Sequence, residues 1–200
     1  ADQYDVAIVG YGPVGQALAI LLGQRGWRVG VFEKQPAAYP LPRAVHFDHE
    51  VGRILQACGI ADDLPALSEA ADVYEWRNAA GATLLRFDSK AAGISGWPDA
   101  NMCAQPELER LLDARARRVA GVAVQRGQEV VGLEASAMDV RLSAATVGGE
   151  RREVTARYVI GCDGANSFVR GHLGATVTDL GFFFDWLIVG QVMPTNPAGA

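Results

Sequence analysis

The stretch Tyr4-Asp-Val-Ala-Ile-Val-Gly-Tyr-Gly-Pro-Val-Gly15 decides the fold of this chain. Its first seven residues form a short, β-branched apolar run, which is typical of a strand covered on both faces in a parallel sheet. A helix is predicted from Pro13 to Gln24, because apolar residues recur there at helical spacing and proline is favourable at a helix start. A glycine-rich loop between such a strand and such a helix indicates a Rossmann-type dinucleotide site.

Each glycine of the Gly-x-Gly-x-x-Gly pattern has a physical role in such a site. Gly10 permits the tight turn, Gly12 lets the backbone approach a pyrophosphate, and Gly15 lets the helix and strand pack closely. The first helical turn, which begins with Pro13 and Val14, offers free N–H groups and a partial positive charge to the anion. We therefore predict that this loop binds the cofactor's phosphates.

An acidic residue after the second strand supports the same interpretation. The strand predicted at 28–32 is followed by Glu33, eighteen residues beyond Gly15. This is close to the spacing of about 20 residues expected for a carboxylate that binds the ribose, and Lys34 beside it is a further candidate. A plain strand-turn-helix with a surface glutamate is the alternative. The pattern alone does not separate FAD from NAD.

The rest of the chain predicts an α/β fold in two parts. Helices are expected at 49–58 and 106–119, and strands at 73–77, 83–87, 122–124, 129–134, 138–142, 153–158, 158–161 and 186–193. The hairpin predicted at 73–87 interrupts the alternation of strands and helices. We therefore expect one discontinuous domain at 1–72 and 101–177, with segments of a second sheet at 73–100 and 178–200.

Composition excludes several classes of protein. Eighteen basic and 23 acidic side chains give a net charge of −5, without the basic stripe that nucleic acid requires. No apolar run approaches the roughly 20 residues of a membrane span, so we expect a cytoplasmic protein. The three cysteines form no Cys-x-x-Cys pair and are interpreted as buried thiols. His46, Asp48 and His49 invite a metal site, but we predict none.

Four motifs appear in an order that resembles one family. They are Pro42-Arg-Ala-Val-His-Phe-Asp-His-Glu50, Gln105-Pro-Glu-Leu-Glu-Arg-Leu-Leu112, Gly161-Cys-Asp-Gly-Ala-Asn-Ser-Phe-Val-Arg170 and Thr178-Asp-Leu-Gly-Phe-Phe-Phe-Asp-Trp-Leu187. Together they resemble the FAD-dependent aromatic-ring hydroxylases, the para-hydroxybenzoate hydroxylase type of monooxygenase. The nearest branch is 3-(3-hydroxyphenyl)propionate hydroxylase. The resemblance covers essentially the whole chain.

The resemblance implies FAD as the cofactor and adds four candidate residues. Arg43 would neutralise cofactor phosphate charge, and Gln105 would contact the ribityl or phosphate region of the flavin. Val130 would meet adenine through its backbone, and Asp163 would organise the pyrophosphate region. Arg43 as a surface arginine and Gln105 as a helix cap are the simpler alternatives. No residue is singled out as an acid-base catalyst.

The resemblance also implies a reaction. NADH or NADPH would reduce FAD, and the reduced flavin would react with O2 to give a C4a-hydroperoxide that hydroxylates a small phenolic aromatic acid. The implied fold is a Rossmann-type FAD-binding domain with a parallel sheet and a β-meander, plus part of an antiparallel substrate-domain sheet. A later Gly-Asp motif of the family has no counterpart here. We therefore expect an N-terminal portion of a longer enzyme, inactive alone.

Three questions stay open at this stage. An NAD-dependent dehydrogenase would use the same glycine-rich loop, and so would a non-catalytic module that binds flavin or nucleotide. The sequence does not distinguish NADH from NADPH or identify the phenol. A homo-oligomer is compatible with the sequence but has no motif that supports it.

Overall fold

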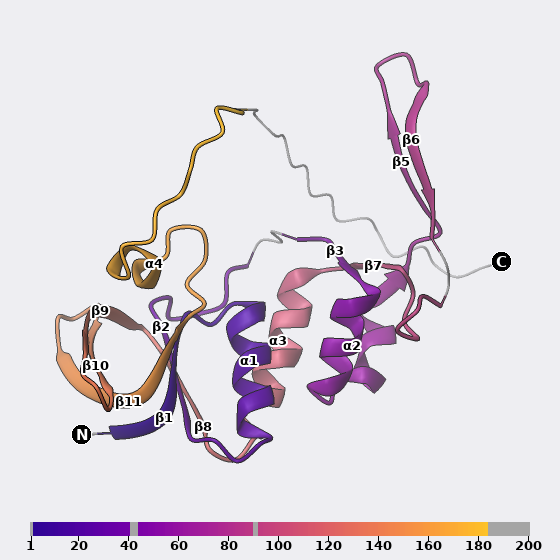
Figure 1. Cartoon of the computed structure of the whole chain (residues 1–200). Helices are drawn as coiled ribbons and strands as arrows, with labels where there is room; N and C mark the ends of the chain where they lie inside the picture. Colours follow the sequence, from indigo (N-terminus) through magenta and orange to yellow (C-terminus); the bar gives the residue numbers. More distant parts are fainter. Residues whose placement is uncertain (1, 41–43, 90–91, 184–200) are drawn as a thin grey trace.

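A six-stranded sheet forms the centre of the chain in the computed structural model, which describes residues 2–40, 44–89 and 92–183 (Figure 1). Its order is β8-β2-β1-β11-β10-β9. The strands are β1 (Asp2–Val9), β2 (Val29–Glu33), β8 (Val122–Arg126), β9 (Gln128–Ala135), β10 (Val140–Thr146) and β11 (Arg151–Gly161). The first four in this order pair in parallel, and β11, β10 and β9 form an antiparallel meander. The predicted parallel sheet with a β-meander is confirmed.

Helices α1 (Pro13–Gly23) and α3 (Gln105–Ala116) pack together against one face of this sheet, with α2 (His49–Ala57) beside them (Figure 1). The alternation of β1 explains how both faces are covered. Val6 and Ile8 join the core beneath the helices, whereas Ala7 and Val9 join a second core that the meander completes. Because both faces of β1 are buried, its sequence reads as a continuous apolar run.

Several short elements were not predicted. Strands β3 (His46–Asp48), β7 (Ala100–Cys103) and β4 (Ser68–Ala70) form a three-stranded antiparallel sheet. A 3₁₀ helix η1 (Ala61–Ala66) and a short helix α4 (Phe168–His172) were also missed. The two strands predicted at 153–158 and 158–161 are one strand, β11, and the strand predicted at 186–193 lies outside the described residues. The missed strands and helices have only three to six residues, which is too few to show a periodic pattern of apolar residues.

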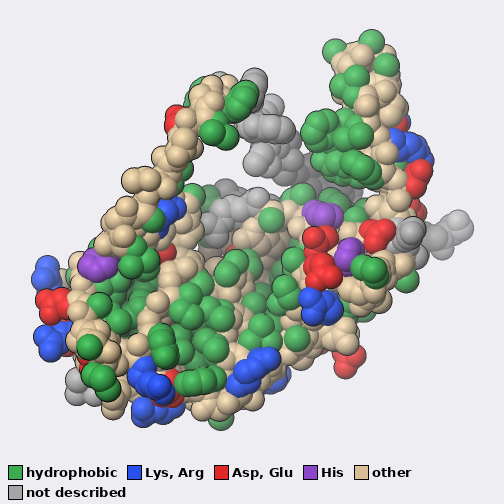
Figure 2. All heavy atoms as spheres, in the orientation of Figure 1, with side chains coloured by type: hydrophobic (Ala, Val, Ile, Leu, Met, Phe, Trp, Pro, Cys, Tyr) green, Lys and Arg blue, Asp and Glu red, His purple; other side chains and the backbone are tan. Residues whose placement is uncertain are grey.

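The predicted hairpin consists of β5 (Val73–Arg77) and β6 (Thr83–Asp88), which project away from the six-stranded sheet (Figure 1). Its turn is closed by Asn78, whose side-chain oxygen accepts hydrogen bonds from the Ala80 and Ala82 amides at 3.0 and 2.9 Å. Figure 2 shows hydrophobic side chains gathered on this hairpin. The exposed aromatic residues are Tyr74, Trp76 and Phe87.

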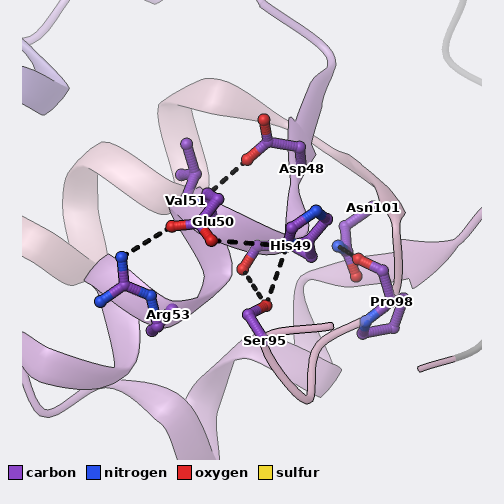
Figure 3. Close-up of polar contacts among 8 residues, drawn as sticks. All are labelled: Asp48, His49, Glu50, Val51, Arg53, Ser95, Pro98 and Asn101. Atoms are coloured by element: carbon purple, nitrogen blue, oxygen red, sulfur yellow. Dashed lines mark hydrogen bonds and ion pairs between the residues drawn. The ribbon is translucent and has the colours of Figure 1, made fainter. Parts of the chain in front are cut away.

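Polar contacts at the start of α2 fix the segment that leads from the hairpin into β7 (Figure 3). Asp48 caps α2 by accepting a 2.8 Å hydrogen bond from the Val51 amide. His49 Nδ1 lies 3.1 Å from the Ser95 hydroxyl, which donates to the His49 carbonyl at 2.8 Å. The buried Asn101 side chain donates to the Pro98 carbonyl at 2.9 Å. The structure thus gives Asp48 and His49 structural partners, and no metal cluster is found among the described residues.

One residue joins the two edges of the six-stranded sheet. Strand β8 ends at Arg126 on one edge, and β9 begins at Gln128 on the opposite edge, with Gly127 between them. Gly127 has φ of +70°, a conformation that glycine adopts without strain. The sheet therefore curls so that β9 approaches β2 as well as β10. Among the helices of residues 2–40, 44–89 and 92–183, none is long and apolar enough to cross a membrane.

Candidate functional site

A cleft of about 770 Å³ lies at the carboxyl ends of the parallel strands. Parallel α/β sheets bind ligands at this end, because the loops after neighbouring strands meet there. Most of the predicted cofactor residues line the cleft: Gly10, Gly12, Pro13, Val14, Glu33, Lys34, Gln105, Val130 and Asp163. Gly15 lies behind the loop, and Arg43 lies outside the described residues. The structure therefore brings together residues that are up to 153 positions apart in the sequence, as from Gly10 to Asp163.

Two glycines of the loop are required by the protein itself. Gly10 has φ of +100°, and a Cβ there would lie 2.4 Å from the Cys162 carbonyl oxygen. A Cβ on Gly15 would lie 2.2 Å from the Gly10 carbonyl oxygen. Both distances are far below van der Waals contact, so neither position has room for a side chain. These contacts hold α1 tightly against the ends of β1 and β11.

Gly12 is different, because a Cβ there would meet no protein atom within 4 Å. Its φ of −77° is also one that any residue adopts. Nothing in the protein therefore requires glycine at this position. The open space lies in the cleft, where a ligand that approaches the backbone closely would need it.

The start of α1 is suited to an anion. Gly12 is the N-cap of the helix, and no side chain forms a capping hydrogen bond there. No acidic residue occupies the first turn. The first N–H groups of a helix have no partner within it, and they carry a partial positive charge. The residues present therefore fit a pyrophosphate at this point of the cleft.

Glu33 lies at the end of β2 and is tied to the loop. One carboxylate oxygen accepts a hydrogen bond from the Tyr11 amide at 2.8 Å, and the other accepts from the Gln35 amide at 2.8 Å. A carboxylate has about four acceptor positions, so it keeps capacity for hydroxyl groups of a ribose. These two bonds fix its position at the rim of the cleft.

Tyr11, inside the glycine-rich loop, is almost completely buried, with 2% of its surface exposed. Its hydroxyl and one oxygen of Asp113 have no hydrogen-bond partner among the described residues. Burial first, and then the negative charge of Asp113, raise the pKa of Tyr11 well above its ordinary range. The Arg126 guanidinium lies over the Tyr11 ring, 4.9 Å from its centroid. The ring is therefore neutral at physiological pH and has a guanidinium over one of its faces.

Gln105 is buried at the start of α3 and organises the chain around it. Its side-chain oxygen accepts a hydrogen bond from the Ala44 amide at 2.6 Å. Its nitrogen donates to the Glu109 carboxylate at 2.6 Å, and Gln16 of α1 donates to the Glu109 carbonyl at 3.1 Å. Gln105 therefore fixes the backbone next to the predicted phosphate ligand Arg43.

Asp163 holds the turn between β11 and α4. Its carboxylate accepts hydrogen bonds from the Ser167 hydroxyl at 2.5 Å and from the Val169 amide at 3.2 Å. Partial burial alone would raise the pKa of Asp163, but these bonds outweigh it and lower the pKa below the ordinary 3.8. Gly164 follows with φ of +79°, which permits the sharp turn. Asp163 is thus an ionised carboxylate that lines the cleft.

We expect Asp163→Ala to lower the free energy of unfolding by roughly 1 to 3 kcal/mol at pH 7, because two donors lose their acceptor. The folded-state pKa is depressed, so this stabilisation is present above pH 3.8 and is lost as the pH falls through the lowered folded value. Urea unfolding of both proteins at neutral and strongly acidic pH measures the difference. An equal difference at every pH would show that the charge of Asp163 is not the cause.

The sequence did not identify several residues that line the cleft. They are Tyr11, Gln35, Ala37, Ala38, Tyr39, Glu109, Arg126, Gln128, Glu129, Asn166 and Phe168, together with the strand ends Val9 and Phe32 and with Cys162. Arg126 gave no signal of its own in the sequence, because its place in the cleft depends on the pairing of β8 with β2, which puts it in register with Glu33. The three cysteines are free, and Cys103 and Cys162 are half-buried rather than fully buried as predicted. Burial raises the pKa of Cys58 to about 11.

Comparison with known proteins agrees with this geometry. The chain is 40% identical over 185 residues to the probable NADH-specific resorcinol 4-hydroxylase of Rhodococcus jostii (strain RHA1). It is 36% identical over 166 residues to a 3-(3-hydroxy-phenyl)propionate/3-hydroxycinnamic acid hydroxylase of Paraburkholderia xenovorans (strain LB400). These alignments cover 92% and 83% of this chain but 35% and 26% of the relatives. The chain thus spans about a third of their length.

Solved structures show the same fold. The crystal structure of p-nitrophenol 4-monooxygenase PnpA from Pseudomonas putida DLL-E4 superposes with a TM-score of 0.79 at 26% identity, over 87% of this chain and 44% of that one. The flavin-dependent monooxygenase PieE, in complex with FAD and substrate, gives 0.75 at 25% identity, over 87% and 33%. The predicted resemblance to FAD-dependent aromatic-ring hydroxylases is confirmed by these relatives.

A family model described as "FAD binding domain" matches residues 3–196. The match includes the strand, the glycine-rich loop, the acidic residue after β2 and the Asp-Gly turn, in the order that the sequence predicted. The cleft lies within the matched residues, and the chain belongs to the FAD binding domain family.

Proposed function

We propose that this chain is the FAD-binding part of a monooxygenase that hydroxylates a phenolic aromatic acid with NADH or NADPH and O2. The main support for this proposal is Gly12, the N-cap of α1. No protein atom lies within 4 Å of a Cβ built there, and no side chain caps the helix, so a phosphate has room to approach the free N–H groups. The relatives named as hydroxylases of resorcinol and of 3-(3-hydroxy-phenyl)propionate support the reaction and the phenolic substrate. The activity belongs to the full-length enzyme.

The residues of the cleft have separate roles in this proposal. The loop from Gly10 to Gly15, with Pro13 and Val14, would hold the pyrophosphate at the start of α1. Glu33 would accept hydrogen bonds from the adenosine ribose, with Lys34 beside it. These groups bind the cofactor through its phosphates and sugar, and they leave its ring system free to react.

Other residues would orient the flavin half of the cofactor. Gln105 would contact the ribityl or phosphate region, and Asp163 would organise the pyrophosphate region from β11. Val130 would meet adenine through its backbone, and Arg43 stays a prediction for phosphate contact. When bound, FAD accepts a hydride from NADH or NADPH and activates O2. The chain's own contribution is to hold and orient it.

The hairpin β5–β6 would belong to the substrate side of the enzyme. We assign residues 1–72 and 101–177 to FAD binding, and 73–100 and 178–200 to the substrate domain. The exposed aromatic side chains of the hairpin, Tyr74, Trp76 and Phe87, support this division, since exposed apolar patches mark contact surfaces. Aromatic rings can also pack against a phenolic ligand or against the other strands of a substrate-binding sheet.

We further propose that the protein is located in the cytoplasm. The three cysteines, Cys58, Cys103 and Cys162, are free thiols. Free thiols are the state that a reducing compartment favours, and NADH and NADPH are available there. A homo-oligomer stays a prediction, which light scattering of the purified enzyme would test.

The test uses the full-length enzyme and measures oxidation of NADH and NADPH with and without a phenolic acid. We expect retained flavin absorbance, faster oxidation when the phenol is present, and an oxygen atom from labelled O2 in the product. Gly12→Asp serves as a variant without bound flavin. Oxidation of an alcohol by NAD without flavin would replace the proposal with a dehydrogenase. Flavin binding without oxygen-dependent oxidation would indicate a non-catalytic module.

A further inference from the structure

Arg126 occupies a position at the cleft that no role above explains. It is the last residue of β8 and is in register with Glu33, the last residue of β2. Because these strands are parallel neighbours, both side chains emerge at the same rim, and both line the cleft. Arg126 therefore lies beside the carboxylate proposed to bind the adenosine ribose.

The side chain of Arg126 is positioned by an aromatic ring. Among the described residues its close partner is Tyr11, with the guanidinium carbon 4.9 Å from the ring centroid. Tyr11 cannot move easily, since it is 2% exposed and its amide donates to Glu33. The two oxygens of Glu33 accept from backbone amides rather than from Arg126. The guanidinium is thus held at the cleft without being neutralised by its neighbour in register.

The charge pattern indicates which part of a ligand would meet Arg126. A phosphate is expected at the start of α1, where helix N–H groups are free. At the rim, a phosphate would be repelled by the Glu33 carboxylate, whereas a neutral base would not. A guanidinium stacks well on an aromatic face, and it is more weakly hydrated than an ammonium group.

We propose that Arg126 forms the platform on which the adenine ring of FAD rests, with Tyr11 supporting the guanidinium from the other side. This inference rests on the proposed binding of FAD and adds a positioning residue for its adenosine half. Val130, across the sheet joint at Gly127, would contact the base from the β9 side. Adenine would then lie between the end of β8 and the start of β9, which Gly127 connects.

The test compares full-length wild-type enzyme with Arg126→Leu, Arg126→Lys and the control Arg118→Leu, which removes the same charge from an exposed position outside the cleft. Dissociation constants of FAD, and of ADP in competition with FAD, are measured by calorimetry. ADP contains the adenosine half but no flavin. Thermal denaturation of each variant without ligand measures any loss of stability separately.

We expect Arg126→Leu to weaken FAD and ADP by the same factor, about tenfold, as stacking of a cation on a ring predicts. Arg126→Lys would recover little of this loss, and high salt would not remove it. The control would bind both ligands as the wild type does.

Three results would overturn the inference. They are an unchanged affinity in Arg126→Leu, a loss for FAD without a loss for ADP, and full recovery in Arg126→Lys with a loss that disappears at high salt. The last would indicate a phosphate contact instead. If wild-type enzyme binds neither FAD nor ADP, the proposed function fails, which is distinguishable from failure of this inference.

Discussion

Gly12→Asp is expected to abolish useful FAD binding while raising the melting temperature of the ligand-free protein slightly. An aspartate at the N-cap can accept hydrogen bonds from the free N–H groups of α1, and its charge is favourable there. This stabilisation of about 0.3 to 1 kcal/mol corresponds to about 1 to 4 °C for a domain of this size. The protein has room for the side chain, since a Cβ meets no atom within 4 Å.

The same carboxylate would repel the cofactor. Two unit charges at about 4 Å in an effective dielectric of about 20 interact by about 4 kcal/mol, which is about a thousandfold in affinity. Titration of FAD into the apoprotein, followed by flavin fluorescence, measures the loss. Gly12→Asn is the matched control, because it has the same size and caps a helix equally well without the charge.

The two variants together separate shape from charge. Gly12→Asn is expected to bind FAD more weakly than wild type but more tightly than Gly12→Asp. Wild-type affinity in Gly12→Asp would show that the pyrophosphate does not approach this residue. A large drop in the melting temperature of the ligand-free Gly12→Asp protein would instead show that glycine is required here by the fold.

Gly10→Ala is expected to destabilise the fold by about 3 kcal/mol or more and to lower the melting temperature by about 6 to 12 °C. Two effects add. Alanine is strained at φ of +100°, and its Cβ would lie 2.4 Å from the backbone oxygen of Cys162. That oxygen belongs to the backbone just after β11, so relief of the overlap requires a shift between β1 and β11.

Gly26→Ala is the control for Gly10→Ala. Its φ of +83° imposes a similar backbone penalty, but a Cβ there meets nothing within 4 Å. We expect it to cost about 1 kcal/mol, or about 2 to 4 °C. Thermal denaturation without ligand measures both variants. Equal losses would mean that the close approach to Cys162 is absorbed without cost.

The central part of the fold was predictable because its signals are local. The apolar run of β1 and the Gly-x-Gly-x-x-Gly pattern each depend on neighbouring residues. The second helix of the core, α3, also shows its apolar spacing within one segment, although it begins at Gln105 and ends at Ala116 rather than at 106 and 119. Helix ends are set by capping and packing, which periodicity does not show.

The rest depended on contacts between distant segments. Arg126 reaches the cleft only because β8 pairs with β2, on the side of β2 opposite to β1. The sequences of the individual strands do not reveal this order. The buried state of Tyr11 likewise follows from packing against α3 and β8, whereas the Gly-x-Gly-x-x-Gly pattern leaves the identity of this residue unspecified. Gln105 resembled a flavin ligand or a cap, but its contact with Ala44 became visible only in three dimensions.

The turn at Gly127, between β8 and β9, has a length on which the shape of the cleft depends. Surface turns ordinarily absorb inserted residues, because little depends on where their two ends lie. Here the turn sets the distance between Arg126 and Val130, which line the cleft from opposite edges of the same sheet. An added residue would let the curled sheet relax and would widen the cleft at the end where we propose that the adenosine binds. Engineering of this domain should therefore place insertions at the Gly81 turn of the hairpin and leave Gly127 unchanged.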